Sequence, residues 1–139
     1  MNPDIQKFIK ATADFDFDLG LITNLNIYNV LLYRTILECA QWCRISLDSA
    51  DKKVYKSIRG VDGFDNAVRN IKKLVLLKKE GRYKTTIGTQ MVVCKQNIGT
   101  IAKLVILAKT LKVDYVQIRP LEILPSDKNP YQKKNIILY

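Results

Sequence analysis

The sequence contains no histidine, and among its 139 residues only three are cysteine. The absence of histidine removes the commonest general base and the commonest zinc ligand. An odd number of unevenly spaced cysteines is a poor disulfide framework. No apolar run approaches the ~20 residues needed to cross a bilayer, and the first ten residues do not resemble a signal peptide. We therefore expect a cytoplasmic protein without a membrane partner.

Acidic residues are also few, with 13 against 23 lysines and arginines, which gives a net charge of +10. The excess lies mainly in Lys72–Lys84 and Lys128–Lys134. A nucleic-acid partner is one interpretation of such charge. No basic motif interleaved with aromatic residues accompanies it, so the sequence favours solvated, lysine-rich helix faces.

Short β-rich runs alternate with longer helical patterns along the chain. The predicted strands are Phe17–Thr23, Trp42–Leu47, Thr85–Val93 and Tyr115–Ile118, and the predicted helical stretches are Ile27–Cys39, Asp51–Ile58, Phe64–Lys79 and Ile98–Leu111. In the helix from Phe64, apolar residues recur on one stripe: Phe64, Val68, Ile71, Val75 and Leu76. Strands separated by helices predict an α/β fold, with right-handed βαβ units and a four-stranded parallel sheet.

Polar residues lie at or near the end of each predicted strand. They are Thr23, Asn24, Ser46, Asp48, Gln90 and Arg119. Ligands of parallel sheets bind beyond the carboxyl ends of the strands, so these are the candidate binding residues. Turns and helix caps are the alternative explanation for any one of them.

The segment Trp42–Leu74 resembles the fourth-strand region of radical S-adenosylmethionine (SAM) enzymes. The family pattern has R-x-S-L-D at the strand end, then a tyrosine, I-R-G, and a phenylalanine that opens a helix. These positions are Arg44, Ser46, Leu47, Asp48, Tyr55, Ile58, Arg59, Gly60 and Phe64, followed by Asn70, Ile71, Lys72 and Leu74. Gly20–Asn24 resembles the third-strand signature L-x-T-N-G, with Leu25 where glycine is usual, so the turn there must differ or be strained. Thr86–Val93 and Val113–Leu121 resemble the fifth and sixth strands.

The resemblance covers about residues 3 to 122 and implies part of a TIM-like (β/α)6 barrel. On this interpretation residues 1–124 are an incomplete radical SAM core, about strands 3 to 6, and residues 125–139 are a loosely ordered basic tail. The family holds a [4Fe-4S] cluster with C-x3-C-x2-C, and its reductive cleavage of SAM gives a 5′-deoxyadenosyl radical that abstracts hydrogen from the substrate. That motif is absent. Cys39 and Cys43 are separated as the first two cysteines of that motif are, but Ser46 occupies the position of the third cysteine. We expect both thiols to be buried packing residues.

The resemblance also implies roles for the strand-end residues. Thr23 and Ser46 match hydroxyls that can contact SAM, and Gln90 matches an amide that can do the same. Asp48 is expected to bind ribose hydroxyls or to cap the next turn. Arg119 could hold a carboxylate through a bidentate pair, or form a salt bridge to Asp48 or Glu122. The sequence assigns Arg59 and Gly60 only to a turn.

Three functions remain open from the sequence. The chain is a fragment of a radical SAM enzyme that is inactive alone, or a subunit of a split enzyme whose N-terminal half lies on another chain, or a basic nucleic-acid-binding module. In the first case the edge of the third family strand lacks a neighbour and is a template for self-association. No motif indicates the substrate.

Overall fold

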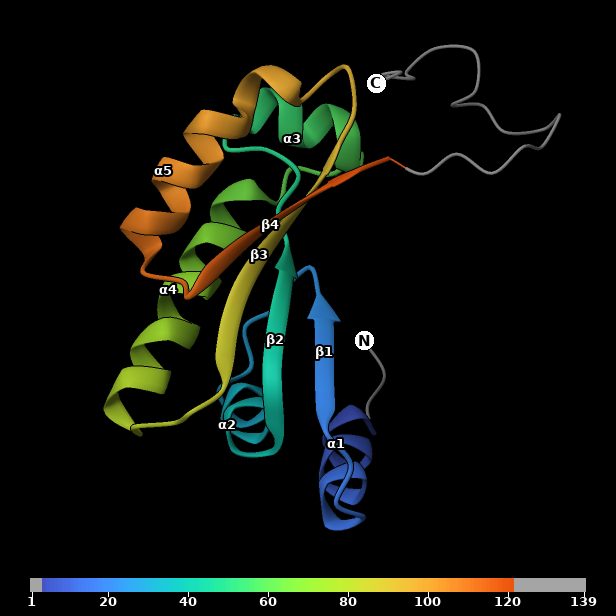
Figure 1. Ribbon diagram of the computed structural model, residues 1–139, viewed down its shortest axis with the longest axis vertical. Helices are drawn as coiled ribbons and strands as arrows, with labels where there is room; N and C mark the ends of the chain where they lie inside the picture. The colour runs from blue at the N-terminus through green and yellow to red at the C-terminus, as the bar shows by residue number, and fades with distance from the viewer. Residues whose placement is uncertain (1–3, 122–139) are drawn as a thin grey trace, which may run out of the picture.

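The computed structural model describes residues 4–121, which form one layer of strands and the helices packed on it (Figure 1). The elements in chain order are α1 (Ile5–Asp14), β1 (Leu19–Thr23), α2 (Val30–Cys39), β2 (Ala40–Ser46), α3 (Lys52–Arg59), α4 (Phe64–Glu80), β3 (Thr86–Val93), a 3₁₀ turn η1 (Ile98–Thr100), α5 (Ile101–Leu111) and β4 (Tyr115–Pro120). The expected basic tail, 125–139, lies outside the described residues. No helix in the described part of the chain is both long and apolar enough to cross a membrane.

The four strands form a parallel sheet in the order β1-β2-β3-β4. The predicted α/β fold with four parallel strands is therefore confirmed. Each strand follows the previous one in space because a helix carries the chain back to the start of the next strand, as parallel pairing requires. All four carboxyl ends consequently lie at one edge of the sheet, and β1 and β4 are its outer strands.

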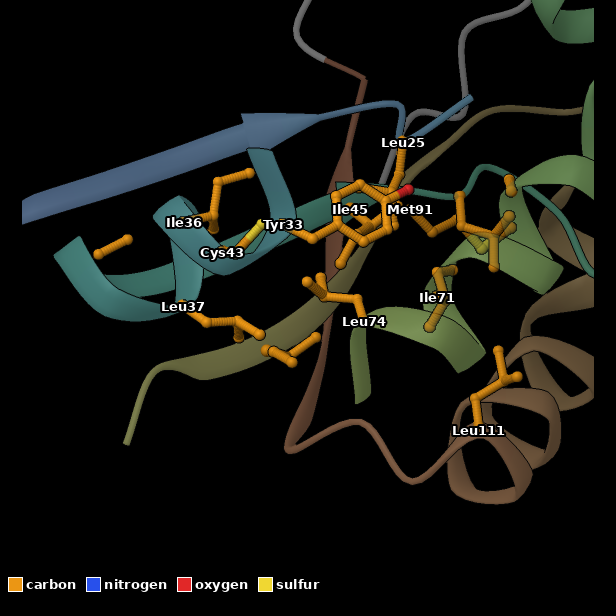
Figure 2. Packing of buried hydrophobic residues seen from close by; sticks show 14 of the residues in the cluster. Leu25, Tyr33, Ile36, Leu37, Cys43, Ile45, Ile71, Leu74, Met91 and Leu111 are labelled. Atoms are coloured by element: carbon orange, nitrogen blue, oxygen red, sulfur yellow. The ribbon is translucent and has the colours of Figure 1, made fainter. Parts of the chain in front are cut away.

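The two faces of the sheet differ sharply in burial. The first, which we call the helix face, carries Cys43, Ile45, Ile87 and Met91, and all four are 0% exposed. Figure 2 shows Cys43, Ile45 and Met91 of the strands lying against Tyr33, Ile36 and Leu37 of α2 and Ile71 and Leu74 of α4. The second, the open face, carries the alternate side chains, which are mostly half-exposed: Ile22, Trp42, Arg44, Ser46, Gln90, Val92, Tyr115, Gln117 and Arg119.

Local sequence signals account for the helix ends. The Asn29 side chain accepts a hydrogen bond from the Leu32 N–H (3.0 Å) at the start of α2, and Asp51 accepts from Lys53 and Val54 at the start of α3. These bonds hold the pKa of the exposed Asp51 carboxyl below its usual value, with the Val54 N–H as the main cause. Gly60 has a φ of 70° and ends α3, which confirms the predicted turn.

The predicted stripe of α4 is correct only in part. Phe64 and Ile71 are buried, but Leu76 is 56% exposed, and Asn70 takes an inward position that the apolar pattern does not predict. Asn70 is buried because its Nδ2 donates to the Leu25 carbonyl at 2.7 Å. A buried amide with a partner costs little, so the helix tolerates it.

The turn after β1 is strained, as the replacement of glycine predicted. Leu25 has a φ of 52°, in the left-handed region that disfavours a branched side chain. Its side chain is nevertheless 4% exposed and belongs to the core cluster (Figure 2). Burial of a leucine side chain contributes about 1.5–3 kcal/mol, which offsets the roughly 1–2 kcal/mol cost of a left-handed residue.

Candidate cofactor-binding edge

The carboxyl-terminal edge of the sheet brings three of the predicted binding residues onto the open face. Ser46 pairs with Gln90, and Gln90 pairs with Gln117, so these three side chains form one row across β2, β3 and β4. The next row toward the edge contains Val92 and Arg119, which are also paired. The in-register strands therefore place hydroxyl, amide and guanidinium groups along one side of the sheet.

Asp48 lies just beyond β2 and is 7% exposed. One carboxylate oxygen, Oδ1, accepts a hydrogen bond from the Val92 N–H at 3.0 Å, and Oδ2 pairs with Nη2 of Arg59 at 2.6 Å. Its carboxylate thus joins the β2 and β3 ends to α3. Of the two predicted roles, this geometry favours the structural one, and the ion pair is with Arg59 rather than with Arg119.

Arg59 is a residue to which the sequence assigned only a turn. It reaches back from the end of α3 to Asp48, and its Nε is buried without a hydrogen-bond partner among residues 4–121. Beside it, a cavity of about 230 Å³ is lined by Asp48, Ser57, Val92 and Cys94. The arrangement leaves a guanidinium donor near this candidate edge of the sheet, which the I-R-G motif alone did not indicate.

Thr23 and Asn24 do not join this row. Thr23 pairs with Ile45, which places it on the helix face, and its Oγ1 accepts the Leu25 N–H at 3.1 Å. Asn24 is exposed, and its Oδ1 accepts the Asn26 N–H at 3.2 Å. The expectation that the polar ends of all four strands face one pocket is therefore wrong for β1, because β1 ends one residue out of phase with Ser46 and its polar residues build the strained turn.

A buried polar network beneath the edge was not predicted. Asn97 is 0% exposed, its Nδ2 donates to the carbonyls of Asp48 (2.9 Å) and Val92 (2.8 Å), and its Oδ1 accepts the Cys94 N–H (2.8 Å). The neighbouring Ser49 Oγ donates to Thr100 Oγ1 at 3.2 Å. This network fixes the loops that carry the edge. Asparagine is common in loops, so the sequence gave no indication that Asn97 is buried in a hydrogen-bond network.

The cysteine positions are unsuited to a cluster. Cys43 lies on the helix face, and burial raises the pKa of its thiol to about 12. The pKa of Cys39 is also raised, first by burial and then by the charge of Glu38. Thiolates are the ligands of iron–sulfur clusters, and the surroundings of both thiols disfavour the thiolate form. Across residues 4–121, no three His, Cys, Asp or Glu side chains gather as a metal site.

Comparison with solved structures identifies the fold as one shared with enzymes of known structure. No family model and no curated protein matches the sequence. SuiB from Streptococcus suis matches with a TM-score of 0.72 over 88% of this chain, at 18% identity. The chain spans only 27% of the length of SuiB.

Two further structures narrow the comparison. SuiB bound to S-adenosylmethionine matches with a TM-score of 0.71 and 17% identity, covering 91% of this chain and 28% of SuiB. A domain of pyruvate-formate lyase-activating enzyme from Bacteroides vulgatus ATCC 8482 matches with a TM-score of 0.67 and 11% identity, covering 89% of this chain and 77% of that domain. These neighbours are radical SAM enzymes, and at such identities the likeness is one of fold.

Proposed function

We propose that this chain supplies the later strands of a radical SAM core and binds SAM at the carboxyl-terminal edge of its sheet. The observation that carries the proposal is the row formed by Ser46 and Gln90 on the open face, in a fold shared with SuiB bound to SAM. The R-x-S-L-D and I-R-G motifs of the sequence support the same conclusion independently.

The side chains of this row suit the polar groups of SAM. The Ser46 hydroxyl can donate and accept, so it matches a ribose hydroxyl or the amino acid part. The Gln90 amide adds a donor and an acceptor beside it, and its Oε1 accepts from Arg44 Nη1 at 3.3 Å, which orients the amide. When bound at a reduced cluster, SAM is the source of a 5′-deoxyadenosyl radical.

The residues of this chain do not fit the cluster itself, because the fully buried Cys43 thiol faces the helices and no three ligand side chains gather within residues 4–121. The proposal therefore requires cysteines other than the three in this sequence, and without them the chain cleaves no SAM. The testable possibility is that a second polypeptide carrying C-x3-C-x2-C supplies these cysteines. Co-expression with such a half should yield a brown complex, and failure to copurify would remove the split-enzyme form.

SAM binding by the chain alone is the direct test. In a two-dimensional ¹H–¹⁵N NMR titration, millimolar SAM should shift the amides of Ser46, Leu47 and Gln90, and Gln90→Leu should abolish the effect. Gln41→Leu is the matched control, since Gln41 is exposed at the other end of β2. Absence of shifts at several millimolar SAM, or shifts confined to α4, would refute the assignment.

A further inference from the structure

A second group of side chains lies on the open face, one row farther from the carboxyl-terminal edge than Ser46 and Gln90. Arg44 of β2 is its centre, flanked by Trp42 on its own strand and by Tyr115 of β4. The guanidinium carbon lies 4.6 Å from the Trp42 ring centroid and 5.8 Å from the Tyr115 ring centroid. The Arg44 Nε donates to Tyr115 Oη at 3.0 Å.

Two glycines make this arrangement possible. A Cβ atom at Gly20 would collide with the Trp42 ring, and a Cβ atom at Gly88 would collide with the Tyr115 ring. Each aromatic ring therefore lies flat across the backbone of a neighbouring strand. Close backbone approach of this kind is a recognised reason for glycine within a strand. The rings hold Arg44 in one orientation instead of leaving it free in solvent.

The charge of Arg44 is not neutralised by this environment. No carboxylate pairs with it in the described chain, whose ion pairs all lie elsewhere. Two of its five N–H groups are used, on Tyr115 and Gln90, which leaves three. The adjacent Gln117 has a buried Oε1 with no partner among residues 4–121. These three N–H groups of a half-exposed guanidinium are open to an anionic ligand, whereas the Gln117 oxygen needs a donor that a carboxylate does not supply.

We propose that Arg44, Trp42 and Tyr115 form a binding site for a small monocarboxylate with an apolar body. One cation among neutral neighbours (Ile22, Gly88 and Tyr115 in its row) matches a single negative charge. The free N–H groups can hold a carboxylate in a bidentate pair. The rings and Ile22, which is 59% exposed, offer apolar surface to the rest of the ligand. The site does not depend on SAM binding.

Trp42 is the one tryptophan of the sequence, so its fluorescence reports on this site alone. Hexanoate should change that fluorescence saturably at constant ionic strength, whereas hexylammonium, with the same apolar body and opposite charge, should not. Arg44→Gln should weaken hexanoate binding at least tenfold. Arg69→Gln is the matched control, because Arg69 is exposed on α4, and it should leave binding unchanged.

Tyr115→Phe provides a second variant that keeps the charge and removes only the hydroxyl that accepts from Arg44. We expect it to weaken hexanoate several-fold with an unchanged circular dichroism spectrum. Equal responses to hexanoate and hexylammonium, or unaltered hexanoate affinity in folded Arg44→Gln or Tyr115→Phe, would overturn the proposal. Failure of SAM to bind would refute the proposed function and leave this site untouched.

Discussion

Replacement of Asn97 tests whether the buried network beneath the binding edge stabilises the fold. Its side chain makes three hydrogen bonds of 2.8–2.9 Å, to the Asp48 and Val92 carbonyls and the Cys94 N–H. Each is worth about 0.5–1.5 kcal/mol net, and a buried group left without its partner costs about 1–3 kcal/mol. Asn97→Ala should therefore lower the free energy of unfolding by about 3–5 kcal/mol, a large part of the ~5–15 kcal/mol typical of a domain.

The measurement is equilibrium unfolding in urea, with Gln96→Ala as the control. Gln96 is the exposed neighbour of Asn97, and its replacement should change stability by less than ~0.5 kcal/mol. Asn97→Asp keeps the shape but turns a donor into a carboxylate oxygen against two carbonyls, so it should destabilise at least as much as alanine. A loss below ~1 kcal/mol in both Asn97 variants would refute the reasoning.

Amide hydrogen exchange tests whether the Asn97 network also holds the residues of the binding edge in place. The Val92 N–H donates to Asp48 Oδ1, and Asp48 keeps its place partly through the Asn97 bond to its carbonyl. Exchange at Val92 should therefore quicken in Asn97→Ala more than exchange in the middle of β2. Uniform quickening would mean that only global stability had changed.

Three other outcomes are expected. Leu25→Gly should relieve the left-handed strain yet lower stability by about 1–2 kcal/mol, because it removes a buried side chain, and a more stable variant by urea unfolding would contradict this. Gly88→Ala should shift the near-ultraviolet circular dichroism of Tyr115, whose ring must move, and an unchanged spectrum would show that the ring is not seated there. The raised pKa of Cys43 predicts stability that is full below its ordinary pKa of 9.0 and falls between pH 9 and 10 with a slope of up to ~1.4 kcal/mol per pH unit, and Cys43→Ala should remove the loss in that window. Above pH 10 the raised pKa of buried Tyr33 adds a loss of its own, which Cys43→Ala should leave in place.

The sequence alone determined the order of the elements and the parallel sheet. Runs such as Thr86–Val93 are rich in β-branched residues and have the length typical of a buried strand, whereas the stretches between them have the period of amphipathic helices. The βαβ order therefore followed from residue type, length and periodicity. The row of Ser46 and Gln90 was also predictable, because parallel strands align their carboxyl ends.

The tertiary structure decided the contacts that depend on the register between neighbouring strands. A one-residue difference in where β1 ends moved Thr23 to the helix face, and no local signal reports such an offset. The Arg59–Asp48 ion pair and the bond from Arg44 to Tyr115 join residues 11 and 71 positions apart. Local sequence propensity determines the helices and strands, whereas contacts across the sheet exist only after the strands have paired. These contacts decide which polar side chains are available to a ligand and which stabilise the fold.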